Sequence, residues 1–345
     1  MKKVSIVSLI LVSVLATGAF AQVSFSGEIH AGIQLQRDGV DDAAFGTYHR
    51  EEGSPRFDFT ATVLRENYGA RLDTTFRMPS DGEGDLTING IYGWVDFDGF
   101  LEDDSIRLTM GQINSTPWVL PRFLPRHSEV KFGDVRGFRV EYATPIEGLS
   151  VGAAFRADGH DVQRFAEQMI FGANFVHPLF TAVFAYDLSN NVQTLFGFNF
   201  MGIPDLTASF QLRGTRLASW DDDAAPFGFP GELQMYYKVG YRIMRPLFVY
   251  LVFGQRFHGV SDMGPYWEIT PGVTYRILPD LVGEFRVTLD NFEGNPNKNL
   301  TITTALEHTL RGPAILYVEY EVSLPNMESN RVIHTFGFGI TIRAF

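Results

Sequence analysis

Long stretches of the chain alternate between apolar and polar residues, and this pattern constrains the fold more than any other feature. In residues 23–36, apolar side chains such as Phe25 and Ile29 occupy odd positions, whereas Glu28 and His30 occupy even positions. Successive side chains of a β-strand point to opposite faces, so this segment is predicted to be a strand with one apolar and one polar face. At about fourteen residues it is longer than most globular strands, but it suits a strand tilted across a membrane.

The same alternation recurs in eighteen segments, and it is weakest in residues 86–97 and 168–187, where both faces are apolar. A soluble sandwich would have to bury all of these apolar faces against a second sheet, and the chain shows no domain break. We therefore predict an all-β fold, a transmembrane antiparallel β-barrel of about eighteen strands, with sixteen as the alternative. The predicted strands are residues 23–36, 56–64, 68–78, 86–97, 105–112, 136–144, 149–157, 168–176, 179–187, 192–200, 206–213, 232–242, 247–256, 265–277, 281–290, 299–309, 314–323 and 331–344.

The connections between these segments alternate between short and mostly longer, polar ones. Outer-membrane barrels have short turns on the periplasmic side and longer loops outside, so the rhythm is typical of such a barrel. From the third short connection onward, each short one contains a proline, which cannot donate a hydrogen bond to a sheet and marks the end of strand pairing. These prolines are Pro145, Pro178, Pro204, Pro246, Pro279 and Pro313.

The beginning of the chain has the features of a cleaved signal peptide. A short basic start precedes an apolar run over residues 4–15, and a small-x-small cleavage site ends at Ala21. The apolar run is too short for a spanning helix, although a retained anchor is the alternative. We expect residues 1–21 to be a signal peptide and residues 22–345 to form one barrel exported to the bacterial outer membrane.

The composition excludes several classes of function. The formal net charge is −12, and loss of Lys2 and Lys3 with the signal peptide would make it −14, so nucleic acid is not an expected partner. The chain has no cysteine, which excludes a disulfide scaffold, a cysteine zinc site and a thiol nucleophile. Its eight histidines are scattered, and no hydrolase, zinc-protease or phosphate-loop motif occurs. We therefore expect no enzymatic activity, no cofactor and no bound metal.

The polar faces of the predicted strands would line the interior of the barrel. A barrel of eighteen strands encloses water, so charges on its inner face would influence which solutes pass. Basic residues are frequent in the early strands and acidic ones in the late strands, which would place a basic wall opposite an acidic wall; an unordered set of solvated charges is the alternative. The predicted pore-lining residues are Arg56, Arg71, Arg77, Arg107, Arg139 and Glu141 on the early wall, and Glu284, Glu307, Glu319 and Glu321 on the closing wall.

The segment between the fifth and sixth predicted strands, residues 114–134, is too apolar for a loop that extends into water. Three prolines within residues 117–125 exclude helix and strand from its first half. Trp118 and Leu120 need a surface to pack on, and the inner wall of the barrel is the nearest. We predict that this third loop folds inward, and an outer loop packed on its neighbours or on a partner subunit is the alternative. The predicted pore-constriction residues are Arg122, Arg126, His127, Glu129 and Lys131.

Two stretches of the sequence resemble the general porins of bacterial outer membranes. Residues 106–117, Ile-Arg-Leu-Thr-Met-Gly-Gln-Ile-Asn-Ser-Thr-Pro, are similar to the fifth strand of that family and the start of its third loop. Residues 136–145, Arg-Gly-Phe-Arg-Val-Glu-Tyr-Ala-Thr-Pro, are similar to its sixth strand with a Tyr-x-x-Pro exit. In that family the third loop folds into the barrel and narrows the channel, so the resemblance implies the same for residues 114–134. The resemblance also allows a homotrimer.

The sequence departs from the general porins in three ways. Those porins have sixteen strands, whereas we count eighteen, the number found in sugar-specific porins. The third loop lacks the acidic cluster that the family usually has. The alternating apolar residues before the terminal Phe345 fall at Ile340 and Ile342, one position out of the usual phase. These departures suggest a distant branch of the family, and a spirochaetal one is our expectation.

Together these features predict a porin, a water-filled channel for passive diffusion of small hydrophilic solutes or ions, surrounded by outer-membrane lipid. An adhesin or structural barrel without an open channel is the alternative. The third loop has a net charge of +1, because three basic residues oppose Glu129 and Asp134. Charges at the narrowest point act through less water, so this loop alone would favour anions weakly unless the acidic wall cancels the effect.

Overall fold

A computed structural model gives the fold of the chain, and the regular elements among the residues it describes are nineteen β-strands. It describes residues 22–39, 43–47, 55–77, 84–99, 101, 104–114, 117–120, 135–157, 168–188, 193–215, 231–258, 266–291, 298–310, 314–325 and 331–344. The strands in these ranges are β1 (Gln22–Asp38), β2 (Ala44–Thr47), β3 (Arg56–Arg65), β4 (Tyr68–Arg77), β5 (Asp85–Asp98), β6 (Ser105–Ile113), β7 (Val135–Ala143), β8 (Leu149–Arg156), β9 (Met169–His177), β10 (Phe180–Asp187), β11 (Gln193–Phe200), β12 (Leu206–Thr215), β13 (Glu232–Met244), β14 (Leu247–His258), β15 (Tyr266–Leu278), β16 (Leu281–Asn291), β17 (Lys298–Thr309), β18 (Ala314–Leu324) and β19 (Ile333–Ala344).

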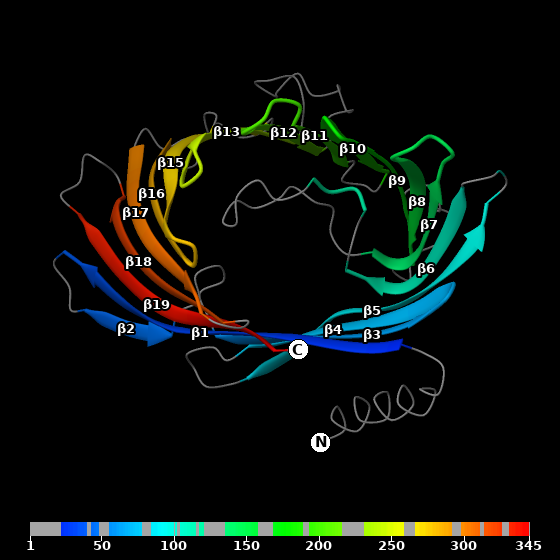
Figure 1. Cartoon of the computed structure of the whole chain (residues 1–345), viewed down its shortest axis with the longest axis horizontal. Helices are drawn as coiled ribbons and strands as arrows, with labels where there is room; N and C mark the ends of the chain where they lie inside the picture. The colour runs from blue at the N-terminus through cyan, green and yellow to red at the C-terminus, as the bar shows by residue number, and fades with distance from the viewer. Residues whose placement is uncertain are drawn as a thin grey trace.

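The strands form one antiparallel sheet that closes into a ring (Figure 1). From β3 to β19, each strand pairs with the next one in the sequence. The ring closes where residues 27–38 of β1 pair with residues 333–344 of β19. A closed barrel leaves no sheet edge with unpaired backbone groups, which is the condition for strands to cross hydrocarbon. The predicted antiparallel β-barrel is therefore confirmed.

Two of the described strands share one place in the wall. β3 pairs with residues 22–30 of β1, and β2 pairs with residues 33–36 on the same side of β1. The described strands therefore occupy eighteen places in the ring, which agrees with the predicted number and excludes sixteen. The strand β2 was not predicted, because residues 37–55 were expected to be a loop. It forms because β1 extends beyond β3 and offers backbone groups that need hydrogen-bond partners.

Alternation along each strand separates an outer face from an inner face. On β1, the outer side chains of Phe25, Ile29 and Ile33 are 37% to 46% exposed, whereas the inner side chain of His30 is 6% exposed. Outer aromatic rings pack on their neighbours across the strands, as with those of Phe210 and Tyr237, whose centroids lie 5.0 Å apart. The outer surface is thus a belt of apolar side chains suited to contact with lipid tails.

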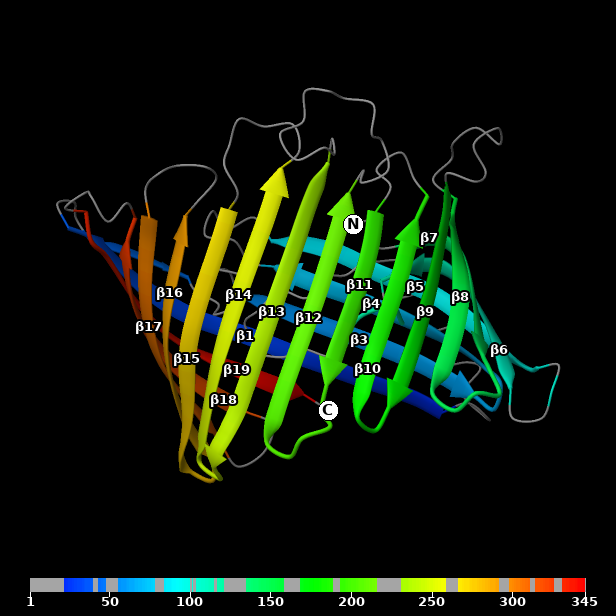
Figure 2. The same cartoon turned by 90° about the horizontal axis from the view of Figure 1, so that it is seen from above.

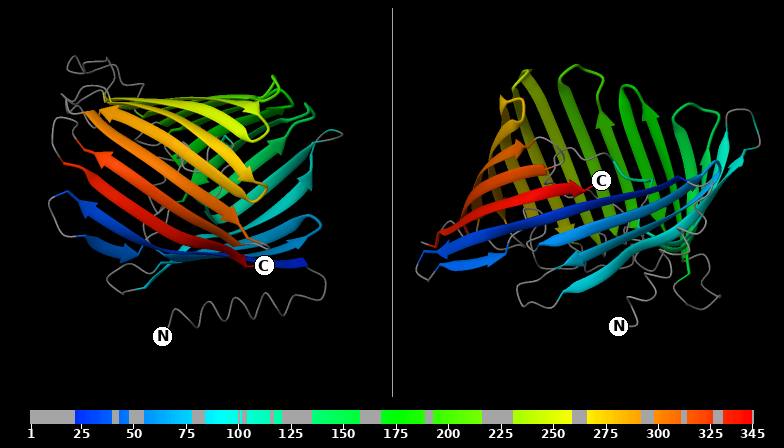
Figure 3. Two further views of the ribbon diagram at one scale, coloured as in Figure 1. Left: turned by 60° about the vertical axis from the view of Figure 1, so that its left-hand side comes forward. Right: turned by 60° about the horizontal axis from the view of Figure 1, so that its bottom comes forward.

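The ends of the strands confirm the predicted turn pattern. Two-residue turns that contain Pro178, Pro246 and Pro279 join successive strands at one end of the barrel. These short turns are visible from above in Figure 2 and from two further sides in Figure 3. Among the described residues, no helix has the length and apolar character needed to span a membrane.

The larger buried apolar cluster of the described residues lies inside the ring, on the wall formed by β6 to β11. It explains why residues 168–187 had two apolar faces in the sequence: one face is turned outward and the other is covered from within. The cluster consists of Ile113, Trp118, Leu120, Val135, Ala154, Ile170, Val183, Ala185 and Leu195.

Candidate pore wall and inner segment

Residues 117–120, here called the inner segment, lie against the inner wall of the barrel. Trp118 and Leu120 are each only 3% exposed, although they belong to no strand. Both pack in the apolar cluster with side chains such as Ile170 of β9 and Leu195 of β11. The loop that leaves β6 therefore starts by folding inward, as the sequence predicted.

Two glycines in the strands make room for the inner segment. A Cβ atom at Gly172 of β9 would overlap the indole of Trp118. A Cβ atom at Gly197 of β11 would lie 2.6 Å from Cδ1 of Leu120. Glycine in the interior of a strand weakens a sheet, but it lets another part of the chain approach closely. Glycines inside two nearby strands are the signal in the sequence that could have located this contact.

The point where the loop leaves β6 is fixed by polar contacts. Asn114 Nδ2 donates a hydrogen bond to Asp73 Oδ2 on β4 at 2.9 Å. Asp73 also accepts hydrogen bonds from Thr60 Oγ1 at 2.6 Å and from Arg71 Nε at 2.9 Å. A carboxylate held by several donors has little freedom to move, so Asp73 fixes Asn114, the first residue of the third loop, to the inner wall.

The predicted site residues divide into two groups. The five predicted constriction residues, Arg122, Arg126, His127, Glu129 and Lys131, lie outside the described residues. All ten predicted pore-lining residues are described, and all of them lie on the inner face by the register of their strands. Within the described part of the chain, no group of three or more His, Asp or Glu side chains is placed to hold a metal ion.

Arginines of the early wall form ion pairs with carboxylates on the same strand or on a nearby one. An arginine and a carboxylate in contact present a dipole rather than a free charge to a passing ion. The described pairs are Arg56 with Asp58 at 2.8 Å, Arg71 with Asp73 at 2.9 Å, Arg107 with Asp96 at 2.6 Å, Arg139 with Glu141 at 2.8 Å, and Arg156 of β8 with Asp187 of β10 at 2.8 Å.

The inner faces of β3 to β8 are therefore balanced in charge rather than basic. Beside Asp58, Asp73 and Glu141, the register of β5 places three further carboxylates there, Asp85, Asp96 and Asp98. The inner-face charges of these strands are Arg56, Arg71, Arg77, Arg107, Arg139 and Arg156 against Asp58, Asp73, Asp85, Asp96, Asp98 and Glu141, six of each sign.

The inner faces of β15 to β18 are acidic. Their carboxylates accept hydrogen bonds from neutral donors, which orient them but leave their charge in place. Tyr250 Oη donates to Glu284 at 2.8 Å, and Thr270 Oγ1 donates to Glu268 at 3.1 Å. The inner-face charges are Glu268, Glu284, Asp290, Glu307, Glu319 and Glu321 against Arg276 and Arg286, so six negative and two positive charges give a net −4. Glu268 and Asp290 were missed in the sequence, although strand alternation could have identified them.

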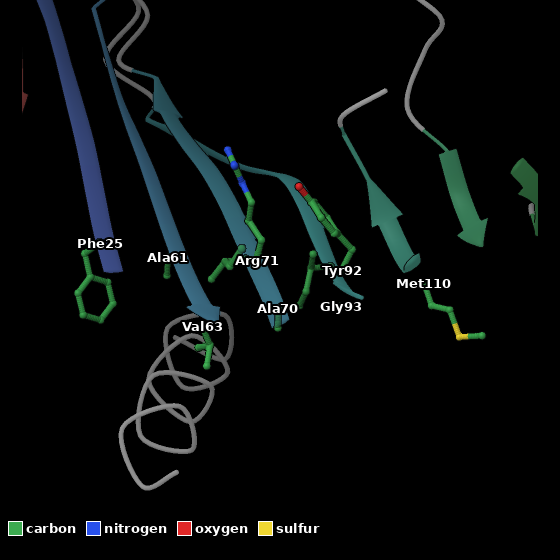
Figure 4. A pocket seen from close by; sticks show the side chains of 10 residues that line it. Phe25, Ala61, Val63, Ala70, Arg71, Tyr92, Gly93 and Met110 are labelled. Carbon is green, nitrogen blue, oxygen red and sulfur yellow. The ribbon is translucent and has the colours of Figure 1, made fainter. Parts of the chain in front are cut away.

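A separate groove of about 350 Å³ crosses the outer face of β1 and β3 to β6. Figure 4 shows Phe25, Val63 and Met110 on one side of the sheet, whereas the side chains of Arg71 and Tyr92 extend to the other side. Its lining is almost entirely apolar. The groove therefore belongs to the apolar outer belt and not to the inner wall.

Several solved structures share the fold of this chain. OccK2 (OpdF) of Pseudomonas aeruginosa matches with a TM-score of 0.63 at 12% identity, over 93% of this chain and 97% of that one. Acinetobacter baumannii OccAB4 matches with a TM-score of 0.62 at 9% identity, over 94% of this chain and 98% of that one. The anion-selective porin from Comamonas acidovorans matches with a TM-score of 0.53 at 13% identity, over 94% of this chain and all of that one (100%). No protein-family model and no curated protein matches the sequence.

The chain thus has the fold of bacterial outer-membrane porins. Its described strands form a closed antiparallel barrel with eighteen wall places, an apolar outer belt and a charged inner face. The matches extend over nearly the whole length of this chain and of the structures compared, so the likeness covers the complete barrel.

Proposed function

We propose that the protein is an outer-membrane porin through which small hydrophilic solutes and ions diffuse passively. The observation that supports this most is the division of the barrel into an apolar outer belt and a charged inner face. A wall of this kind contacts lipid on one side and water on the other. The structures that share the fold include channels, which favours a channel over an enzyme.

We propose further that residues 1–21 are removed as a signal peptide and that the mature barrel is embedded in outer-membrane lipid. The basic start, the apolar run and the cleavage motif ending at Ala21 support export. The exposed apolar side chains of the outer belt support contact with lipid. A homotrimer is proposed on the sequence resemblance to general porins alone.

The third loop is proposed to form the constriction of this channel. Two described residues that flank residues 121–134, Leu120 before them and Val135 after them, both belong to the inner apolar cluster. The segment between them therefore starts and ends on the inner wall. This placement supports the proposal that Arg122, Arg126, His127, Glu129 and Lys131 meet solutes inside the barrel.

Planar-bilayer recording of the purified protein tests the proposed function. A porin should insert in steps of equal conductance, and the steps should persist without an applied ligand. Vesicles that contain the protein should also swell in isotonic solutions of small sugars. A correctly folded barrel that gives neither conductance nor swelling would instead be the structural barrel or adhesin considered from the sequence.

A further inference from the structure

We propose that the channel prefers cations, because its solutes pass along the acidic wall formed by β15 to β18. This inference rests on the proposed function as a channel and concerns which solutes that channel admits. It departs from the weak anion preference expected from the charge of the third loop alone. The argument depends on where the inner segment lies, which charges it leaves accessible, and how those charges are held.

The inner segment covers one side of the barrel. Trp118 lies over Gly172 of β9, and Leu120 lies over Gly197 of β11. In the ring of strands, β9 lies opposite β18, as Figure 1 shows when the barrel is viewed end on. A segment packed on β9 and β11 takes up space on that side. The open cross-section is therefore displaced towards the opposite side of the ring, where β18 of the acidic wall lies next to β19 and β1.

Three basic groups, on β8, β13 and β14, are buried or paired, whereas Arg213 of β12 donates a hydrogen bond to the neutral Gln193 at 3.2 Å. Lys238 on the inner face of β13 is only 1% exposed. Arg156 is paired with Asp187, which is fully buried at 0% exposed. Arg256 of β14 is paired with Glu232 at 3.0 Å. A charge that is buried or compensated by a neighbouring carboxylate has a weaker effect on a passing ion than an accessible uncompensated one.

The inner face of the acidic wall, by contrast, has a net negative charge. Its net charge is −4, against the balanced inner faces of β3 to β8 and the +1 of residues 114–134. Glu268 accepts hydrogen bonds from Tyr266 Oη at 3.2 Å and Thr270 Oγ1 at 3.1 Å. Glu321 likewise accepts them from Thr303 Oγ1 at 3.4 Å and Ser323 Oγ at 3.3 Å. These hydroxyl donors orient the carboxylates, and the net negative charge of the wall attracts small cations and repels anions of the same size.

The test compares two double variants that change the total charge equally. E268Q/E321Q removes two charges from the acidic wall and keeps the shape of the side chains. E66Q/E147Q removes two charges from exposed residues in the short turns and serves as the matched control. The wild-type protein and both variants are placed in planar bilayers with a gradient of KCl, and the reversal potential gives the permeability ratio of K⁺ to Cl⁻.

We expect the wild-type channel to favour K⁺, and E268Q/E321Q to lower the permeability ratio by at least about threefold, since a single unit charge about 6 Å away has an effect of that size in water. The control should leave the ratio unchanged. The preference should also be stronger at 0.1 M than at 1 M salt, where the screening length falls from about 10 Å to about 3 Å. Resistance of the folded barrel to unfolding by detergent and heat shows that each variant has assembled.

The outcomes separate this inference from the proposed function. Absence of any conductance in correctly folded wild-type protein would refute the proposed channel. An open wild-type channel that favours Cl⁻ would overturn the cation preference while leaving the channel intact. An equal shift in E268Q/E321Q and E66Q/E147Q would show that total charge, and not this wall, determines the selectivity.

Discussion

The indole of Trp118 covers Gly172 of β9 so closely that no side chain larger than hydrogen fits between them. Trp118 lies outside the strands, 54 residues before Gly172 in the chain, yet it is only 3% exposed. The contact fastens the first part of the third loop to the inner wall. Because the two residues are complementary in size, each can be used to test the position of the other.

We expect Gly172→Ala to displace the inner segment. The added methyl group overlaps the indole ring, and overpacking of this kind costs about 1–3 kcal/mol. The expected result is a higher and noisier single-channel conductance. Gly283→Ala is the matched control, because a Cβ atom there would meet its nearest neighbour at an ordinary 3.4 Å.

The Trp118→Ala variant completes a double-mutant cycle. Removal of a large buried aromatic side chain should cost about 3–5 kcal/mol, measured by unfolding in urea in the presence of lipid. In this background the further change Gly172→Ala should have little effect, because the clash has gone. Additive effects of the two changes on conductance would show that they do not act through one contact.

A second prediction tests which face of the barrel is outside. Ile302 and Thr301 are neighbours on β17 and lie on opposite faces, Ile302 outside and Thr301 inside. Ile302→Arg places a charge against hydrocarbon, which should cost about 2–4 kcal/mol near the middle of the membrane. Thr301→Arg faces water and should be tolerated. Folding yields into lipid vesicles check this, and equal yields for both variants would contradict the assignment of the faces.

A third prediction concerns Asn114, the first residue of the third loop. Asn114→Ala removes the hydrogen bond to Asp73, which should cost about 1 kcal/mol. The barrel should remain folded, while the open-channel current should fluctuate more because the loop is less firmly held. Gln36→Ala, on β1, removes an inner polar side chain whose described hydrogen bond is to Gln34, and it should leave the current noise unchanged. Increased noise in both variants would argue against a specific role for Asn114.

Much of the barrel could be predicted from the sequence because its physical signal is local. Alternation along a strand depends only on adjacent residues, and Phe25 and His30 fall on the faces that the pattern predicts. The prolines of the short turns also act locally, since proline cannot take part in sheet pairing. The number of strands followed from these two signals together.

The candidate site was less accessible to sequence reasoning because it depends on contacts between distant segments. Alternation places Arg107 and Asp96 on the inner face, but the ion pair between them requires the register of β5 against β6. In the sequence, the part of the wall that the inner segment covers showed only as weak alternation in residues 168–187. Its cause, a loop that packs inside the barrel, became clear from the contact of Trp118 with Gly172.

The last prediction tests the proposed constriction. If residues 114–134 narrow the pore, the variant R122E/R126E changes the charge by −4 at the narrowest point, where each charge acts through little water. The reversal potential in a KCl gradient should then shift towards greater cation preference. R65E/R245E changes the total charge equally at the short-turn end of the barrel and should cause a much smaller shift in the reversal potential.

A second variant tests the same proposal by conductance. Deletion of residues 121–131 should raise the conductance of the folded barrel. An unchanged reversal potential in R122E/R126E would place these arginines outside the pore, even though the loop begins on its inner wall.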